Sequence, residues 1–362
     1  MSLDRIALSD FRNHRDTRLS GARQFNLLLG PNGAGKTNVL EAISLFAPGR
    51  GLRRAVLSQM VRGDACAGFA IGADLVSGQT PVRLGTTMRS EAPGRRVVLA
   101  SGSPLPAARL AEWLSVSWLT PSMDGLFTDS ATARRRFLDR MTAAVSPAHA
   151  THSAKYERAL RERNRILGGE GGADPQWLDA LEREMAEAGE AIGAGRAALL
   201  SRLAERIEAL PDGPFARPDA VLDTASSLDL AAALKENRPI DRRAGRTLVG
   251  PHRADLKVSL VPPSGPPRPA HSCSTGEQKA LLVSLVVAHA EIASGSRPLV
   301  LLLDEIAAHL DPVRREALFS RLADSGAQIW MTGTENEPFA AIADVARSWH
   351  LENGALRGED EA

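Results

Sequence analysis

The chain has 362 residues, 43% of them hydrophobic and 24% charged, which is ordinary for a globular protein and long enough for two domains. Its formal net charge of +1 excludes a globally basic nucleic-acid binder and restricts any such surface to a local patch. Two cysteines, Cys66 and Cys273, exclude a disulfide framework and favour a reducing, cytoplasmic location.

The first third of the chain is expected to contain mostly strands, with one helix between them. Strands are expected at residues 3–9 and 25–29, and the second, FNLLL, is a continuous apolar run typical of a buried strand. A helix is expected over residues 37–46, ended by Pro48, and residues 65–100 are expected to be rich in strands. MSLDRIALSDF predicts no signal peptide, since no apolar stretch follows a basic one.

From about Arg134 the apolar period becomes helical, and it predicts a helical hairpin with a turn at residues 168–175. Its second arm, if continuous to Leu210, would be roughly 50 Å long and is expected to pack within a helical lobe. A helix over residues 276–293 and a strand over 299–303 follow. The short apolar run inside that helix contains His289 and Glu291 and predicts no membrane span.

We therefore expect an α/β fold built from both ends of the chain, with an inserted, mainly helical lobe. The expected boundaries place an N-terminal part of the α/β domain at residues 1–120 and the helical lobe at 121–240. The C-terminal part of the α/β domain is expected at residues 241–362.

The strongest motif is GPNGAGKT, which fits the phosphate-binding loop G-x-x-x-x-G-K-[ST] between an apolar strand and a helix. Its backbone N–H groups are expected to converge on phosphate oxygens of ATP, beside the positive end of the helix. Lys36 is expected to reach the β- and γ-phosphates, and Thr37 to hold Mg²⁺. The loop consists of Gly30, Pro31, Asn32, Gly33, Ala34, Gly35, Lys36 and Thr37.

The second motif is LVLLLDE, an apolar strand that ends in two acids. Asp304 is expected to fix Mg²⁺, directly or through its water shell, and Glu305 to orient or deprotonate the attacking water. Acids after a strand are also common as helix caps. The phosphate loop in the same chain favours the catalytic interpretation, with Lys36, Asp304 and Glu305 as the catalytic set.

The third motif is STGEQK, residues 274–279, which reads as a capping box with Ser274 at the N-cap and Glu277 three residues on. A helix N-terminus with a glycine and a hydroxyl is also an anion site. The two interpretations coexist, because the cap builds the site. AAHLD, residues 307–311, follows the two acids.

Together these motifs resemble the ABC ATPase class, in which the signature helix meets the γ-phosphate of the opposite subunit and the D-loop crosses the dimer interface. The resemblance implies nucleotide contacts for Ser274, Gly276, Gln278 and Asp311. Asn38 and Glu41, after the phosphate loop, resemble the SMC and RecF branch, whereas transporters carry a histidine where this chain reads IWMTGTENE.

Spacing and further motifs narrow the resemblance to the RecF family. Asp304 follows Lys36 by 268 residues, which is too long for a compact transporter ATPase and too short for an SMC coiled coil. The matching segments cover nearly the whole chain; they are LSDFRNHRD, LTPSMDGLFTDSATARRRFLDRM, YERALRERNRIL and GPHRADL. RecF proteins often have Asp where this chain has Glu305. Family resemblance also suggests that Arg12, Asn13 and His14 border the nucleotide, against a purely structural turn.

The family resemblance implies ATP-dependent homodimerisation, binding to duplex DNA near gaps or junctions, and help in loading RecA through RecO and RecR, with weak, DNA-stimulated ATP hydrolysis. Candidate DNA contacts would bind backbone phosphates, although a solvated or ion-paired arginine is the simpler interpretation of each, since 39 of the 44 basic residues are arginine. The candidates are Arg50, Arg53, Arg54, Arg62, Arg134, Arg135 and Arg136.

Two other functions remain as alternatives on the sequence alone. The ATP-binding subunit of a membrane transporter would need a permease partner and an ATP turnover indifferent to DNA. An overcoming-lysogenization-type ATPase would need an acidic, metal-binding nuclease domain after the ATPase, and we expect no room for one before Ala362.

Overall fold

The computed structural model describes residues 2–77, 80–169, 174–210, 213–224, 229–293, 297–307 and 310–357. The chain divides into two compact units. Unit 1 comprises Met1–Asp124, Pro211–Phe215 and Leu282–Ala362, and unit 2 comprises Gly125–Leu210 and Ala216–Leu281. Residues 241–281, which the sequence had grouped with the C-terminal α/β part, therefore lie in the unit that contains the helical hairpin.

A six-stranded sheet in unit 1 carries the phosphate loop. Its order is β15-β14-β3-β13-β12-β8, and all pairs are parallel except β14 with β15. Every residue of β3, β12 and β8 is buried, which is typical of parallel strands covered on both faces. The strands are β3 (Phe25–Leu29), β8 (Ser115–Leu119), β12 (Leu299–Leu303), β13 (Gln328–Gly333), β14 (Ala346–Glu352) and β15 (Ala355–Leu356).

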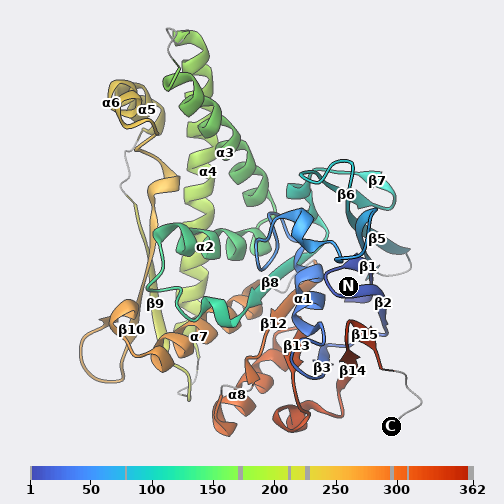
Figure 1. Ribbon diagram of the computed structural model, residues 1–362. Helices are drawn as coiled ribbons and strands as arrows, with labels where there is room; N and C mark the ends of the chain where they lie inside the picture. Colours follow the sequence, from blue (N-terminus) through green and yellow to red (C-terminus); the bar gives the residue numbers. More distant parts are fainter. Residues whose placement is uncertain are drawn as a thin grey trace. The chain divides into compact units, whose positions relative to one another are not determined.

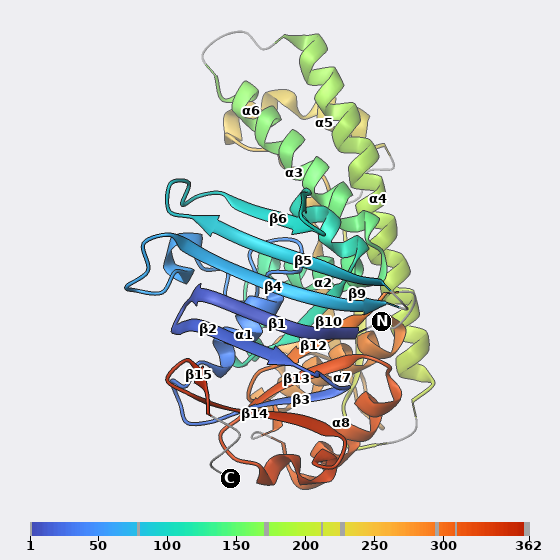
Figure 2. The same ribbon diagram turned by 90° about the vertical axis from the view of Figure 1, so that its right-hand side faces the viewer.

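A second, antiparallel sheet in unit 1 has the order β2-β1-β4-β5-β6-β7, and Figure 2 shows its strands side by side. Leu3, Ile6 and Leu8 of β1 are buried and join one apolar core with Val39 and Leu40 of α1. The spacing of three between Leu3 and Ile6 coincides with a shift of register between Leu3 and Arg5 in the pairing with β4. The strands are β1 (Ser2–Phe11), β2 (His14–Ser20), β4 (Gly68–Ser77), β5 (Thr80–Arg89), β6 (Arg96–Ala100) and β7 (Ser103–Pro104).

The helices of unit 1 match the predicted positions closely. The helix after the phosphate loop, α1 (Lys36–Ser44), starts one residue earlier and ends two residues earlier than predicted. The unit also contains α8 (Pro312–Asp324) and, from Leu282 onward, most of α7 (Thr275–Ala293). Its short 3₁₀ helices are η1 (Leu57–Met60), η2 (Ala107–Glu112), η3 (Pro121–Met123) and η7 (Glu337–Ile342).

Unit 2 is built on the predicted helical hairpin. In both views α3 (Ala148–Leu167) and α4 (Pro175–Glu208) run side by side (Figures 1 and 2). The 34 residues of α4 make it roughly 51 Å long. Asp174 caps α4 by accepting from the N–H of Gln176 at 2.9 Å, with Pro175 at the first helical position, directly after the predicted turn.

The remaining elements of unit 2 pack around this hairpin. A three-stranded antiparallel sheet has the order β11-β10-β9. Apolar residues of α3 and α4, among them Tyr156, Met185 and Ile192, form a core with Leu234. The elements are α2 (Ala131–Val145), α5 (Leu230–Glu236), α6 (Arg238–Ala244), η4 (Pro251–Arg253), η5 (Ala270–Ser272), β9 (Arg217–Asp223), β10 (Asp255–Val261) and β11 (Arg268–Pro269).

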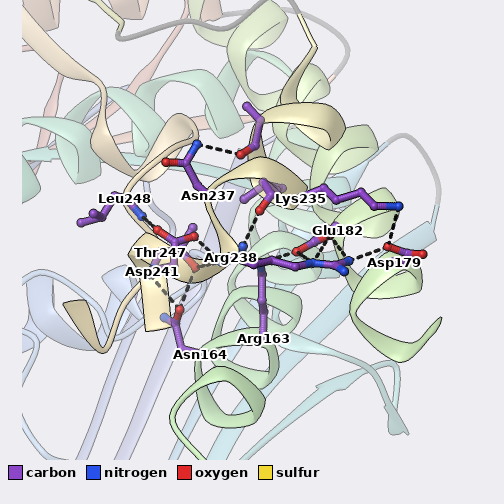
Figure 3. A network of polar contacts seen from close by, with 12 residues as sticks. Arg163, Asn164, Asp179, Glu182, Lys235, Asn237, Arg238, Asp241, Thr247 and Leu248 are labelled. Carbon is purple, nitrogen blue, oxygen red and sulfur yellow. Dashed lines mark hydrogen bonds and ion pairs between the residues drawn. The ribbon is translucent and has the colours of Figure 1, made fainter. Parts of the chain in front are cut away.

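A buried polar network ties α3 and α4 to α5 and α6 (Figure 3). The guanidinium of Arg163, which is completely buried, donates to Glu182 at 2.9 Å, to Asp241 at 2.7 Å and to the hydroxyl of Thr247 at 2.7 Å. A fourth bond goes to the carbonyl of Leu234 at 2.7 Å. Each of the three guanidinium nitrogens therefore donates to an acceptor oxygen, two of them to negatively charged carboxylates. These bonds offset the cost of burying the charge of Arg163.

A membrane-spanning helix is not found among the described residues, because none of their helices is both long enough and apolar enough.

Candidate functional site

The phosphate loop owes its shape to glycines whose backbone other residues cannot easily adopt. Gly30, Gly33 and Gly35 have φ angles of 144°, 83° and 107°, all in the region that favours glycine. A Cβ on Gly30 would lie 2.2 Å from the carbonyl oxygen of Leu351, and one on Gly35 would lie 2.6 Å from Nε2 of His14. The absence of side chains at Gly30 and Gly35 therefore lets Leu351 and His14 pack directly against the backbone of the loop.

Lys36 closes the loop. Its ammonium donates to the carbonyl of Gly30 at 2.6 Å and to that of Pro31 at 2.9 Å. Burial lowers the pKa of Lys36, while the nearby charges of Glu305 and Asp304 act in the opposite direction. The only lysine of the loop is thus placed beside both acids of the second motif, in a position to interact with phosphate charge.

Thr37 and Asp304 come together although 267 positions separate them. The hydroxyl of Thr37 donates to Oδ1 of Asp304 at 3.0 Å. They meet because β3 and β12 are parallel and both pair with β13, so their carboxyl ends lie at one edge of the sheet. The backbone N–H of Asp304 donates to the carbonyl of Leu119 at 2.9 Å, which fixes the acid at the end of β8 as well.

The donors at this edge suit Mg²⁺. One hydroxyl and one carboxylate are hard oxygen ligands, and Mg²⁺ characteristically takes one or two such protein groups together with waters and phosphate oxygens. Within the described ranges, no three His, Cys, Asp or Glu side chains gather into a metal-binding cluster. The pair of Thr37 and Asp304 is therefore the arrangement on which a magnesium site would rest.

Glu305 lies on a pocket of about 190 Å³ next to the loop. Its backbone has a φ of 55°, unusual for a residue with a side chain, and its N–H donates to the hydroxyl of Thr332 at 2.9 Å. Besides these two residues, the lining consists of Asn32, Lys36, Gly333, Thr334, Pro338 and Phe339. A carboxylate beside a lysine in such a pocket suits the role of a general base toward water.

The turn between β1 and β2 abuts the loop from the other side. Asn13 donates to the carbonyl of Gly33 at 3.3 Å and accepts from the side-chain amide of Asn38 at 2.8 Å. His14 is completely buried, and its Nε2 lies 3.1 Å from the carbonyl oxygen of Gly35. Burial lowers the pKa of His14, which favours a neutral imidazole at this contact. Asn13 and His14 thus support the loop directly.

Arg12 contacts Glu41 on α1, whereas Asn13 and His14 contact the phosphate loop. Its guanidinium forms two bonds to the buried carboxylate of Glu41, at 2.7 and 2.8 Å. Arg53 also donates to Glu41, at 3.0 Å, and to the side-chain oxygen of Asn38 at 2.6 Å. A buried carboxylate needs such partners, so Glu41 organises the turn and the segment after α1 around the loop. The structure places Arg12 on Glu41, and only Asn13 and His14 on the loop.

The predicted capping box is present at the start of α7. The N–H of Ser274 donates to the carboxylate of Glu277 at 2.8 Å, and the N–H of Glu277 donates to the hydroxyl of Ser274 at 3.3 Å. Arg268 adds an ion pair to Glu277 at 2.5 Å. Ser274 and Gly276 are exposed, whereas Gln278 is buried, with its amide donating to the carbonyl of Cys273 at 2.9 Å.

Gln278 is therefore turned away from the exposed face on which Ser274 and Gly276 lie, although it was expected among the nucleotide contacts. Of the expected D-loop, Ala308 and His309 lie outside the described residues. Asp311 acts as the N-cap of α8, since its carboxylate accepts from the N–H of Arg314 at 2.9 Å.

The candidate DNA-binding arginines fall into two groups. Arg50, Arg54 and Arg136 are exposed, and Arg53 is exposed too but also bonds within the protein. The other four make bonds within the protein: Arg53 as described, Arg62 with Asp10 at 3.0 Å, Arg134 with Asp255 through two bonds of 2.8 Å, and Arg135 with the carbonyl of Ala254 at 2.7 Å. These bonds favour a structural role for Arg134 and Arg135, because a guanidinium held by a carboxylate or carbonyl offers fewer donors to phosphate.

Known proteins are similar to this chain over nearly its whole length. A family model described as the RecF/RecN/SMC N-terminal domain matches residues 2–356. The DNA replication and repair protein RecF of Brucella suis is 46% identical over 377 residues, which cover 99% of this chain and 96% of that protein. RecF of Mesorhizobium japonicum is 44% identical over 378 residues, covering 99% of this chain and 98% of that protein.

Solved structures agree in fold. A structure of the recombination mediator protein RecF with ATP has a TM-score of 0.81 at 22% identity, covering 98% of this chain and 96% of that one. An SMC head domain from Pyrococcus furiosus, bound to the C-terminal domain of ScpA, has a TM-score of 0.55 at 15% identity, covering 98% and 95%. The fold is thus the expected α/β ATPase head of the SMC and RecF type.

Proposed function

The chain belongs to the RecF family of DNA replication and repair proteins, and from that premise we propose that it is an ATP-switched DNA clamp. In this proposal two copies of the chain close around ATP and hold double-stranded DNA near gaps or junctions. The observation that carries it is the meeting of Lys36, Thr37 and Asp304 at one sheet edge, in a family whose relatives act in DNA repair.

The phosphate loop and the two acids support binding of ATP with Mg²⁺. The N–H groups after Gly33 and the N-terminus of α1 provide donors and a positive dipole end for phosphate oxygens. Thr37 and Asp304 would hold Mg²⁺, which neutralises phosphate charge when bound. Glu305 lies on the pocket beside Lys36, where it would accept a proton from the attacking water. We expect hydrolysis to be slow and stimulated by DNA.

The start of α7 supports a nucleotide site shared between two copies. Ser274 and Gly276 are exposed at a helix N-terminus whose capping hydroxyl is fixed by Glu277. Such a terminus binds anions through its unsatisfied N–H groups and dipole. We propose that in the dimer this terminus meets the γ-phosphate held by Lys36 of the partner copy.

DNA contact would come from exposed arginines, with Arg50, Arg54 and Arg136 as the first candidates. Contacts to backbone phosphates make binding independent of sequence and weaker at high salt. By family resemblance, the DNA-bound dimer would work with RecR and RecO to load RecA. A transporter subunit remains a poor alternative, because the relatives matched over the full length are DNA repair proteins.

The test is size-exclusion chromatography of Glu305→Gln with ATP and Mg²⁺, with and without duplex DNA. Removing the general base should trap the ATP-bound state, so we expect a dimer that retains DNA. Lys36→Ala should stay monomeric and should not bind DNA, because its loop loses the charge that attracts phosphates.

Ser274→Arg separates the two halves of the proposed site. It should bind ATP as the wild type does and yet fail to dimerise, since the larger side chain obstructs the surface that meets the partner and the lost cap weakens only the first turn of α7. Loss of ATP binding in this variant would mean that Ser274 serves its own subunit's nucleotide. A monomer under every condition, or a dimer indifferent to both ligands, would refute the clamp.

A further inference from the structure

The hydroxyl of Thr332 connects the two acids of the site. Thr332 lies near the end of β13 and is almost completely buried. Its neighbourhood follows from strand register, because Leu303 of β12 pairs with Met331 of β13 in a parallel ladder. The next residue on each strand, Asp304 and Thr332, therefore lies at the same sheet edge.

The two hydrogen bonds of this hydroxyl have defined directions. Thr332 Oγ1 donates its single proton to Oδ1 of Asp304 at 2.8 Å, since an ionised carboxylate can only accept. The same oxygen accepts from the backbone N–H of Glu305 at 2.9 Å. Oδ1 of Asp304 also accepts from Thr37 at 3.0 Å. One threonine thus orients a carboxylate side chain and the backbone of the next residue.

The backbone of Glu305 needs such a restraint. Its φ of 55° lies in the left-handed region, which a residue with a side chain adopts only when its surroundings impose it. The bond from its N–H to Thr332 is a specific contact that holds this conformation. In that conformation Glu305 lines the pocket that also contains Lys36.

We propose that Thr332 is a positioning residue, which fixes the carboxylate of Asp304 for Mg²⁺ and the backbone of Glu305 for proton transfer from water. This inference rests on the proposed ATP hydrolysis at the same site. Thr332 acts through the two acids and need not touch the nucleotide. Its hydroxyl, and not its bulk, is the required feature.

Another buried threonine provides the matched control. Thr86 on β5 is as buried as Thr332, but among the described residues its hydroxyl has no hydrogen-bond partner. Replacing either threonine with valine keeps the shape of the side chain and removes the hydroxyl. Thr86→Val should therefore leave ATP hydrolysis unchanged. Thr332→Val should remove the hydrogen-bonded link between the carboxylate of Asp304 and the backbone N–H of Glu305.

The experiment compares Thr332→Val with Thr332→Ser and Thr332→Ala. Serine keeps the hydroxyl, and serine and alanine both lack the γ-methyl, so this pair isolates the hydroxyl even if the valine variant folds poorly. We expect kcat for ATP hydrolysis to fall by about tenfold or more in the valine and alanine variants, but less than about threefold in serine. ATP affinity without Mg²⁺ should stay within about twofold of the wild type, whereas the gain in affinity on adding Mg²⁺ should shrink.

A second readout does not depend on turnover. Hydrogen exchange of the Glu305 amide in the protein without nucleotide should become about tenfold faster in Thr332→Val, because its acceptor is lost. The amides of β12, which bond to neighbouring strands, should exchange as before. Wild-type kcat and exchange in Thr332→Val, or equal behaviour of the alanine and serine variants, would overturn the proposal. If the wild type itself does not hydrolyse ATP, the proposed function fails, while the exchange and Mg²⁺ measurements still decide the role of Thr332.

Discussion

Replacing Arg163 with methionine should destabilise unit 2 strongly. The methionine fills much of the same volume but removes four hydrogen bonds, to Glu182, Asp241, Thr247 and the carbonyl of Leu234. These partners do not suffer equally. Glu182 keeps the guanidinium of Arg238, which donates to it at 2.5 Å.

Asp241 determines the magnitude of this effect. Its carboxylate is completely buried, and once Arg163 is gone it keeps the hydrogen bond from the backbone N–H of Leu248 at 3.0 Å but loses its counter-ion. Leaving a buried charge without its counter-ion costs about 3–5 kcal/mol. We expect the free energy of opening of the α3–α4 hairpin to fall by about that amount.

Hydrogen-exchange mass spectrometry can measure this loss locally, with peptides from α3 and α4 compared with peptides from the unit 1 sheets. Arg165→Met is the control, because Arg165 is exposed on the same helix and pairs with Glu162 three residues away, so its loss should leave the exchange of α3 and α4 nearly unchanged. Arg163→Met combined with Asp241→Asn should recover part of the stability. A change below about 1 kcal/mol in Arg163→Met, or no recovery in the double variant, would refute the reasoning.

Three further predictions concern other contacts. Hydrogen bonds from Arg134 lower the pKa of Asp255 to about 2, below its ordinary 3.8. The pair should therefore add about 2 kcal/mol to the free energy of unfolding above about pH 4, and this contribution should disappear as the pH falls toward 2. Urea unfolding of Asp255→Asn across this pH range should lack this acid-dependent loss of stability. Gly35→Ala should abolish ATP binding in calorimetry, because the methyl group would lie 2.6 Å from His14, whereas Gly102→Ala, at a φ of 85° with open space, should bind normally. Ser274→Ala should speed amide exchange in the first turn of α7, since the lost cap stabilises it by about 1 kcal/mol; unchanged exchange would contradict the capping role.

Local patterns predicted the elements that carry the chemistry. The strand at residues 299–303 is observed at those positions, and the capping box at Ser274 has the expected two bonds. Glycines, caps and apolar runs act within a few residues, so sequence spacing is enough to find them. The RecF family and its ATPase-head fold were also predicted, since their motifs are specific.

Contacts between distant segments could not be predicted in the same way. The pairing of β12 with β13 places Thr332 on Asp304, but no pattern in the sequence states that register. Arg134 was a candidate DNA contact, with ion pairing as the simpler interpretation, but nothing in the sequence identified its partner as Asp255, 121 positions away. The sequence shows that an arginine is present, but it does not show which carboxylate the arginine pairs with, because the chain contains many acidic residues at similar sequence distances.

The seating of the phosphate loop against the last strands has a consequence for protein synthesis. The N–H of Gly354 donates to the carbonyl of Ala34 at 2.9 Å, and the carbonyl of Leu351 lies against Gly30. At ordinary translation rates, β14 and β15 emerge from the ribosome on the order of tens of seconds after the loop. During that interval the loop lacks its contacts with Leu351 and Gly354, so ATP should stabilise a nascent chain little. A chain truncated before these strands would therefore carry the phosphate loop but should bind ATP poorly.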